Sequence, residues 1–380
     1  MLLLLLLSFL FLIRPLDLPH AENIFSSLFG VKYLTAMIIS AIVIVAYTTL
    51  GGFLAASTTD FIQSIIMSVA LIVVLIFGVE TAGGIGAVIH NASELPGYLS
   101  MTLSYDVNTG KAAPYSALTI VSTAAWGLGY FGMPHILLRF MAIEDEKKLK
   151  LSRRVATIWV VISLFVAVFI GVIGYTMSKV GALEMLTGSN SETIIVKISA
   201  LLSQHGVIFA LLAGVILAGI LASTMSTSDS QLLAASSAVS SDILGAFRKD
   251  SSNKNGSMAA ARITLLVISV VAAFIARNPD SSVFAIVSFA WAGFGAAFGP
   301  VVLFSLFWKR TSKWGALAGM VCGGSMVFIW KYLIRPLGGI WNIYELLPAF
   351  LIACAAIVIV SLLTPNLPKK SKRNLTGSHR

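Results

Sequence analysis

Long apolar runs constrain the fold of this sequence more than any other feature. Hydrophobic residues make up 57% of the 380 residues and charged residues only 11%, against about 25% charged in soluble domains. Nine runs of roughly 20 residues are separated by polar, Gly and Pro clusters, and they cover about 34–50, 61–79, 115–141, 155–178, 207–240, 259–277, 282–308, 313–333 and 344–364. Because about 20 helical residues cross a bilayer core, the pattern predicts an all-α, polytopic membrane helix bundle of about nine transmembrane spans.

The basic residues are unevenly divided between the two sides of these predicted spans. Eighteen Lys and Arg residues fall on one side, including those of 139–154 and of the C-terminal tail, and eight fall on the other. Since Lys and Arg are enriched in cytoplasmic loops, we expect a multi-pass protein of the cell (inner/cytoplasmic) membrane with a cytoplasmic C-terminus. This topology accounts for the net charge of +10, so we expect no nucleic-acid partner.

The two ends of the chain differ from its middle. Residues 1–33 are a divergent N-terminal segment, residues 34–365 the predicted transmembrane domain and residues 366–380 a basic tail. Leu2–Ile13 is apolar but too short to span a membrane. Three interpretations of it are open: a signal-like insertion segment, an outer half-helix, or the cut end of a helix from a larger protein.

The third apolar run contains the sequence WGLGYFGMP at 126–134, with three glycines and a proline in nine residues. Each glycine costs a helix about 1 kcal/mol and the proline about 3 kcal/mol, so we expect a break. Half-helix ends near the middle of a membrane can hold an ion or a zwitterion, and Trp126 and Tyr130 share a face if the intervening turn is helical. The alternative is a kink that only allows close helix packing. His135, just beyond the proline, is expected to be a packing residue.

A second polar segment lies at 221–237. Five hydroxyl residues share one helix face there: Ser223, Ser226, Thr227, Ser230 and Ser237. Hydroxyl oxygens combined with backbone carbonyls make a chemically plausible Na⁺ site. The alternative for each hydroxyl is a hydrogen bond to the carbonyl four residues earlier. Asp229 lies in the same segment, and a carboxylate inside a span normally lines a pathway, although it could also lie in the wet cytoplasmic half.

Asp60 follows Gly51–Gly52 at the start of the second predicted span. A carboxylate at a helix N-terminus can be a cap, and its functional alternative is part of a cation exit path.

The remaining features predict structure rather than chemistry. Gly315, Gly319 and Gly323 recur every four residues, which is typical of closely packed helices. Cys322 and Cys354 lie inside apolar runs and are expected to be core residues. The sequence has no phosphate-binding loop, dinucleotide-binding fingerprint, zinc-binding cluster or nucleophile elbow, so we do not expect an enzyme.

Taken together, several segments resemble the sodium/solute symporter family, and within it the bacterial sodium/proline symporters. They are GGFLAASTTDFIQSIIM (51–67), WGLGYFGMPHILLRFMA (126–142), ILASTMSTSDSQLLAASSA (220–238), NPDSSVFAIVSFAWAGFGAAFGPVVLFSLFW (278–308) and WGALAGM (314–320). The resemblance implies an inverted-repeat (LeuT-like) transporter fold with alternating access. It also implies that one small solute enters with Na⁺ as the coupling ion.

The resemblance assigns cation roles to residues of the second and fifth apolar runs. Ser226 and Thr227 match sodium-ligating hydroxyls, and Ser223 stands where a backbone carbonyl completes that site. Asp60 matches an acidic position important for cation coupling. Asp229 has no counterpart role in the family and is a pathway candidate on its own chemistry.

The resemblance places the substrate at the break in the third run. Trp126 and Tyr130 match positions that line the substrate cavity, and Gly127, Gly129 and Pro134 shape the broken helix around it.

Family members usually begin with several more helices, so this chain is expected to lack the first helices of the fold. Because the first of them supplies an acidic residue near the sodium, weak or absent Na⁺ binding is expected for this chain alone. The expected function is sodium-coupled uptake of a small amino acid, with proline as the expected substrate. Two alternatives are a non-transporting remnant or split half of such a symporter, and a membrane sensor or partner subunit.

Overall fold

The computed structural model describes residues 33–106, 109–243, 254–275 and 283–364, and the chain divides into two units. The first unit comprises Met1–Pro114 and Ala142–Ser282, and the second comprises Tyr115–Met141 and Val283–Arg380. The predictions for the segment before residue 33 and for the basic tail 366–380 lie outside the described residues.

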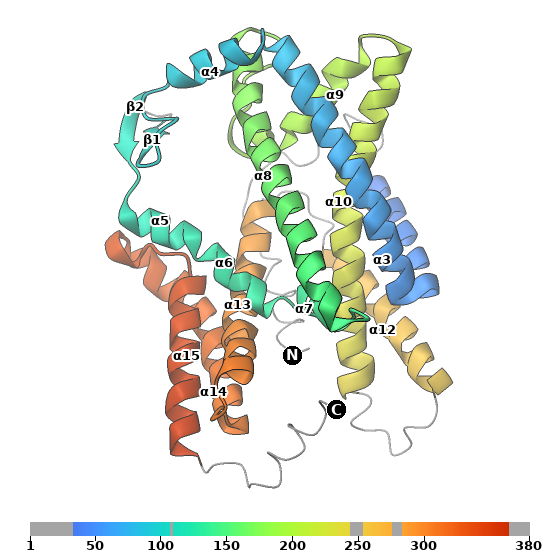
Figure 1. Ribbon diagram of the computed structural model, residues 1–380, viewed down its shortest axis with the longest axis vertical. Helices are drawn as coiled ribbons and strands as arrows, with labels where there is room; N and C mark the ends of the chain where they lie inside the picture. Colours follow the sequence, from blue (N-terminus) through green and yellow to red (C-terminus); the bar gives the residue numbers. More distant parts are fainter. Residues whose placement is uncertain (1–32, 107–108, 244–253, 276–282, 365–380) are drawn as a thin grey trace. The chain divides into compact units, whose positions relative to one another are not determined.

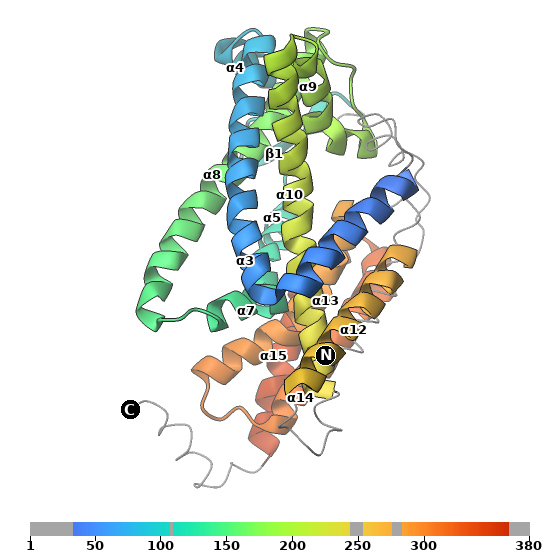
Figure 2. The ribbon, with the colours of Figure 1, turned by 90° about the vertical axis from the view of Figure 1, so that its right-hand side faces the viewer.

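The first unit is a set of helices with a small hairpin (Figures 1 and 2). Its α-helices are α3 (Tyr33–Thr81), α4 (Ile85–Ser93), α8 (Leu149–Lys179), α9 (Ile194–Ser203), α10 (Val207–Ser237) and α12 (Lys254–Ile275). Short helical turns η2 (Glu146–Lys148), η3 (Gly188–Thr193) and η4 (Ala238–Ile243) adjoin α8, α9 and α10. Strands β1 (Leu103–Asp106) and β2 (Lys111–Pro114) pair antiparallel, with Leu103 opposite Pro114 and Asp106 opposite Lys111.

Helix α3 contains the first two predicted spans in one bent element. A straight helix of its 49 residues would be about 74 Å long, more than twice the roughly 30 Å hydrocarbon core. Gly52 leaves the helical conformation at φ 59° and ψ −150°, a region that glycine enters without a side-chain clash. The kink gives α3 two arms, visible in Figure 2, and each arm corresponds to one predicted span.

Apolar side chains of α3, α8, α9 and α10 form the core of the first unit. Ile173, Met177, Ile198 and Ile216 are fully buried there, and Leu202 is 1% exposed. Because polar backbone groups are satisfied within each helix, packing of these side chains fixes how the helices meet.

The second unit holds the remaining elements. Its helices are α5 (Ala117–Ala124), α6 (Trp126–Gly129), α7 (Pro134–Met141), α13 (Val283–Phe307), α14 (Lys313–Ile329) and α15 (Leu346–Leu363). The short turns are η1 (Tyr130–Gly132), η5 (Trp330–Ile334), η6 (Arg335–Leu337) and η7 (Gly339–Trp341). Hydroxyl caps start two of the helices, since Ser116 accepts from the Thr119 N–H and Ser312 from the Gly315 N–H.

The glycines of α14 pack as their spacing predicts. A Cβ on Gly315 or Gly319 would overlap side chains of α15, and a Cβ on Gly323 would overlap the Ala296 backbone of α13. The three glycines therefore let α13, α14 and α15 approach closely, and the packing prediction is confirmed.

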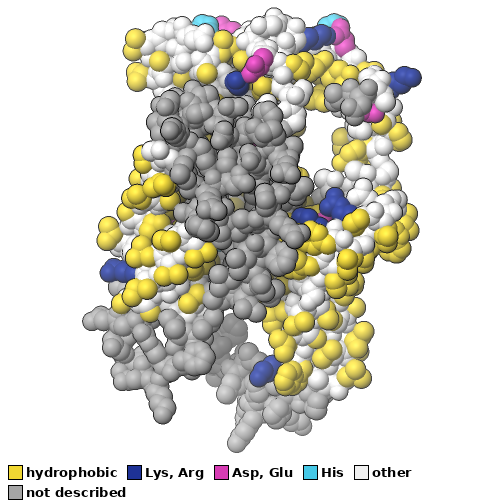
Figure 3. All heavy atoms as spheres, turned by 180° about the vertical axis from the view of Figure 1, so that it is seen from behind, with side chains coloured by type: hydrophobic (Ala, Val, Ile, Leu, Met, Phe, Trp, Pro, Cys, Tyr) yellow, Lys and Arg dark blue, Asp and Glu magenta, His cyan; other side chains and the backbone are white. Residues whose placement is uncertain are grey.

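Six helical stretches of the described residues are long and apolar enough to cross a membrane, and they lie at Ile38–Thr81, Glu146–Lys179, Val207–Ser240, Val287–Phe307, Lys313–Leu337 and Leu346–Leu363. The first contains two predicted spans, the run at 115–141 is broken into short helices, and the apolar part of α12 is the shorter Ala259–Ala272. Hydrophobic side chains cover much of the described surface (Figure 3), and Leu54 and Phe165 are 79% and 70% exposed. Such a surface suits lipid, and the predicted helical membrane fold is confirmed.

Candidate functional site

The predicted break at 126–134 is present in the second unit. Helix α6 ends at Gly129, a 3₁₀ turn covers Tyr130–Gly132, and Met133 is extended at φ −81° and ψ 113°. Helix α7 then begins at Pro134, where the missing N–H costs nothing because the first turn has no acceptor for it. The interruption places helix ends inside an apolar run, which is the arrangement that can hold a zwitterion. Gly129 and Gly132 are buried against Trp291 and the Phe294 backbone of α13, so the break also allows the close helix packing given as the alternative.

Trp291 of α13 brings the two predicted substrate residues together. Its ring stacks on Trp126 with the ring centroids 5.5 Å apart, and it meets Tyr130 edge-on at 4.8 Å. The Trp291 indole N–H also donates to the Trp126 carbonyl oxygen at 2.9 Å. Gly129 makes this contact possible, because a Cβ there would overlap the Trp291 indole, whereas the space around Gly127 is open.

The aromatic cluster keeps part of its surface accessible. Tyr130 is 48% exposed, Trp126 is partly buried, and the Trp126 ring also stacks on Tyr344 at 5.9 Å. Trp291 and Tyr344 were not predicted as site residues from sequence, because their contacts with Trp126 join segments more than 150 residues apart. His135 is partly buried in α7, as expected of a packing residue.

The three predicted sodium ligands meet on α10 in the first unit. The Ser226 Oγ donates to the Ser223 carbonyl oxygen at 3.1 Å, and the Thr227 Oγ1 donates to the same oxygen at 3.2 Å. Both hydroxyl oxygens therefore lie within hydrogen-bond distance of the same carbonyl oxygen, and we call these atoms the three-oxygen group. The Ser223 hydroxyl bonds back to the Ile220 carbonyl at 2.9 Å, so its backbone oxygen is the part available to the group.

These oxygens fit an alkali cation in chemical type. They are neutral, hard donors, and each hydroxyl retains lone pairs after donating its proton. Ser226 is half-buried and Thr227 is exposed, so the group is open on one side. The same hydrogen bonds also realise the alternative in which the hydroxyls bond back to their own helix.

Asp229 is the fully buried acidic residue of α10, with 0% exposure. Its carboxylate accepts a hydrogen bond from the Tyr47 hydroxyl at 2.8 Å and another from the Ser230 hydroxyl at 3.1 Å. Tyr47 lies in the first arm of α3, so this bond joins two helices 182 residues apart in sequence. The sequence offers no signal for this pairing, because Tyr47 is one aromatic residue in an apolar run.

Asp60 lies in the second arm of α3, eight residues after the kink at Gly52. It is therefore about two turns inside a continuous helix, and the cap interpretation, which needs a helix N-terminus, is wrong. Its charge acts on Asp229 and on Tyr47, so both carboxylates belong to one electrostatic neighbourhood within the first unit.

The predicted site residues thus form two groups. Trp126, Tyr130 and the glycines and proline of the break lie in the second unit, and the hydroxyls and both carboxylates lie in the first. Together with the apolar helices, they define a multi-pass membrane protein with a broken span and an oxygen-lined helix.

Comparison with known proteins identifies the family. The family model "Sodium:solute symporter family" matches residues 1–323, and the chain belongs to this family. It is 37% identical over 351 residues to the "Osmoregulated proline transporter OpuE" of Bacillus subtilis (strain 168), covering 92% of this chain and 68% of the relative. It is 38% identical to the "Sodium/proline symporter" of Salmonella typhimurium, covering 90% of this chain and 64% of the relative.

The chain therefore spans about two thirds of the length of these relatives. Among solved structures, it is similar to a Na⁺-coupled sialic acid symporter in a substrate-bound outward-open state. The TM-score is 0.72 at 16% identity, over 96% of this chain and 72% of the other. This similarity confirms the predicted transporter fold.

Proposed function

We propose that this chain carries out sodium-coupled uptake of proline across the cytoplasmic membrane. The observation that carries the proposal is the meeting of the Ser226 and Thr227 hydroxyls at the Ser223 carbonyl in a member of the sodium:solute symporter family. A relative named as a sodium/proline symporter, at 38% identity, supports the choice of ion and substrate, and two relatives named as proline transporters, at 37% and 39% identity, support the substrate.

In this proposal, Na⁺ binds to the Ser223 carbonyl and to the hydroxyls of Ser226 and Thr227. The hydroxyl protons rotate away from the Ser223 oxygen, so that all three oxygens face the ion. Ion binding favours the conformation that holds it best, and proline binds more tightly to that conformation, which couples the two fluxes.

Asp229 and Asp60 act in this proposal as the negative charges of the cation pathway. Asp229 lies two residues after Thr227 on the same helix, and its partners Tyr47 and Ser230 are neutral hydroxyls. A carboxylate inside a low-dielectric span attracts positive charge strongly.

Trp126 and Tyr130 form the substrate surface in this proposal. Their rings offer apolar faces to the pyrrolidine ring of proline, and the half-helix ends at Gly129 and Pro134 offer partial charges to its ammonium and carboxylate groups. Gly127 adds no side chain, which leaves room beside Trp126.

The orientation is part of the proposal. The excess of Lys and Arg on one side of the spans supports a cytoplasmic C-terminus in the cell membrane.

The test is uptake of labelled proline by the chain in proteoliposomes, with and without an inward sodium gradient. The key variant is Ser226→Ala/Thr227→Ala. The matched control is Ser228→Ala on the same helix, whose hydroxyl bonds to the Thr224 carbonyl at 2.8 Å and lies outside the three-oxygen group. Sodium-dependent binding of labelled proline is measured in parallel on the detergent-solubilised chain.

We expect the unsubstituted chain and the Ser228→Ala control to take up proline in a sodium-dependent way and the double variant to lose this uptake. If the double variant keeps some activity, its sodium concentration for half-maximal uptake should be raised at least about tenfold. Two results contradict the proposal. In the first, the correctly inserted chain neither takes up nor binds proline, or does so independently of sodium. In the second, the double variant shows the same sodium dependence as the control.

A further inference from the structure

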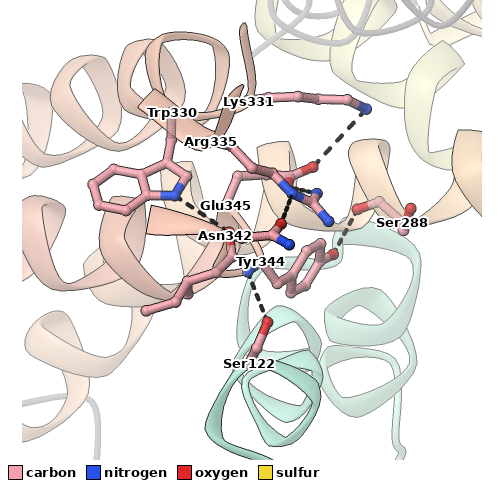
Figure 4. Close-up of polar contacts among 9 residues, drawn as sticks. Ser122, Ser288, Trp330, Lys331, Arg335, Asn342, Tyr344 and Glu345 are labelled. Atoms are coloured by element: carbon pink, nitrogen blue, oxygen red, sulfur yellow. Dashed lines mark hydrogen bonds and ion pairs between the residues drawn. The ribbon is translucent and has the colours of Figure 1, made fainter. Parts of the chain in front are cut away.

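Glu345 forms a buried ionic cluster at the start of α15 in the second unit (Figure 4). It is 1% exposed, and its carboxylate accepts a hydrogen bond from the Arg335 guanidinium at 2.9 Å. The Lys331 ammonium lies 3.9 Å from the other carboxylate oxygen and 3.9 Å from the centroid of the Phe289 ring. A carboxylate held by two cations and excluded from water fixes the segments that carry them, because separating the charges leaves one uncompensated.

The loop before Glu345 is held at further points. Arg335 donates a second hydrogen bond to the Asn342 side-chain oxygen at 3.1 Å, and the Trp330 indole donates to the Ile343 carbonyl at 3.2 Å. Residues 342, 343 and 345 are therefore each tied to η5 or η6. Tyr344 lies between them, so its backbone position is determined by the cluster.

Tyr344 connects this loop to the broken helix. Its N–H donates to the Ser122 hydroxyl of α5 at 2.7 Å, and its own hydroxyl donates to the Ser288 carbonyl of α13 at 2.6 Å. Figure 4 shows the Tyr344 ring between these two anchors. With both ends fixed, the ring stacks on Trp126 at 5.9 Å with an angle of 16° between the planes.

We propose that Tyr344 is a positioning residue that sets substrate selectivity by holding the Trp126 ring, and so fixes the size of cyclic amino acid that the surface accepts. The inference rests on the proposed function. Tyr344 acts through Trp126, whose ring also stacks on Trp291 at 5.5 Å and on Phe284 at 5.7 Å. Trp291 holds the Trp126 backbone as well, through its hydrogen bond to the Trp126 carbonyl. When the Tyr344 ring is absent, Trp126 loses one of these three stacking contacts, so its ring shifts toward the vacated space and the surface accepts a larger substrate ring.

The first test compares uptake of proline with uptake of its six-membered ring homologue, pipecolate. Tyr344→Leu removes the ring, and Tyr344→Phe keeps the ring but loses the hydroxyl bond to Ser288. Tyr332→Leu is the matched control, because Tyr332 is a 46% exposed aromatic residue of the same unit that packs on Phe289. KM and maximal rate are measured for both substrates.

For Tyr344→Leu we expect the preference for proline over pipecolate to fall about three- to tenfold, the range that one aromatic contact supports, through KM and with little change in maximal rate. Tyr344→Phe is expected to keep most of the preference, and Tyr332→Leu all of it. An unchanged preference in Tyr344→Leu, with both substrates slowed equally, overturns the inference, because that is the effect of a purely structural residue.

A second measurement tests the positioning without transport. A cysteine is placed at Gly127, beside Trp126 in open space, with Cys322 and Cys354 replaced by alanine, and its alkylation rate is followed. We expect Tyr344→Leu to change the rate severalfold and Tyr332→Leu to leave it unchanged. Equal alkylation rates with and without the Tyr344→Leu substitution overturn the positioning role. If the unsubstituted chain takes up no proline, that result counts against the proposed function, and the alkylation rate still decides the role of Tyr344.

Discussion

Replacement of Gly129 by alanine tests the contact that assembles the aromatic cluster. A Cβ at Gly129 would overlap the Trp291 indole, so the ring has to move, and its hydrogen bond to the Trp126 carbonyl is lost. Gly127 is the matched control, because it lies two residues away in the same short helix and a Cβ there meets nothing within 4 Å.

The expected magnitudes follow from these contacts. Overpacking costs about 1–3 kcal/mol and the lost hydrogen bond about 0.5–1.5 kcal/mol, while replacing a helical glycine by alanine returns up to about 1 kcal/mol. Gly129→Ala is therefore expected to lower the free energy of unfolding by about 1–3 kcal/mol. Gly127→Ala is expected to leave it unchanged or to raise it by about 0.5–1 kcal/mol.

The assay is denaturant-induced unfolding of the two variants and the unsubstituted chain in lipid bicelles, followed by tryptophan fluorescence. The difference between the two variants should be about 1–4 kcal/mol, with Gly129→Ala the less stable. Equal stability of the two variants would falsify the reasoning, because it would mean that the indole does not occupy the space above Gly129.

Three further predictions concern other contacts. Tyr47→Phe removes the hydrogen bond to the buried carboxylate of Asp229, and we expect the free energy of unfolding to fall by about 1–2 kcal/mol, between the average for membrane hydrogen bonds and the value for bonds to charged groups. A double-mutant cycle with Asp229→Asn should give a coupling energy of similar size, and additive effects of the two substitutions would contradict the prediction. The Lys179 ammonium lowers the pKa of the Glu94 carboxyl in the folded chain. The ionised Glu94 therefore stabilises the fold above its unfolded pKa of about 4.3, and this contribution is lost as the pH falls through the lower folded pKa. As the pH falls below about 4, the free energy of unfolding should therefore decline less steeply in Glu94→Gln than in the unsubstituted chain. High salt should reduce this difference between the two chains, and pH curves that superimpose at low salt would refute the prediction. Gly323→Ala should destabilise the chain by about 1–3 kcal/mol in the same unfolding assay because its Cβ overlaps the α13 backbone, whereas Gly293→Ala, in open space, should not.

The membrane spans were predictable because each depends on local composition. A run of about 20 apolar residues has one low-energy conformation in a bilayer, since only a helix satisfies every backbone group internally. The break at Trp126–Pro134 was predictable for the same reason, because the penalties of glycine and proline act within the segment itself.

The boundary between the first two spans was less predictable. Gly51–Gly52 suggested an end of the first span, but α3 continues through it because Gly52 absorbs the turn in one residue. The hairpin at 103–114 was missed because its strands are four residues each and their pairing gives no long alternating pattern.

The contacts that organise the candidate sites depend on tertiary structure. Trp291 meets Trp126 across 165 residues, and Tyr47 meets Asp229 across 182, so neither pair leaves a periodic trace in one sequence. The sequence placed Asp229 in the hydroxyl-rich segment 221–237, but only the fold shows that the Tyr47 and Ser230 hydroxyls donate hydrogen bonds to it.

Glu345 and Asp229, the two acidic residues that are buried in the described part of the chain, differ in how their charges are balanced. Glu345 is paired with Arg335 and has Lys331 nearby, so its charge is compensated within the protein and its role is to hold a loop. Asp229 is buried equally deeply, but the side chains that donate to it among the described residues are the neutral hydroxyls of Tyr47 and Ser230. Hydrogen bonds orient a carboxylate without cancelling its charge, so an ionised Asp229 leaves a negative potential inside the span. A mobile cation is the natural counter-charge there. This asymmetry is the physical reason to look for the proposed Na⁺ pathway beside Asp229 and not beside Glu345.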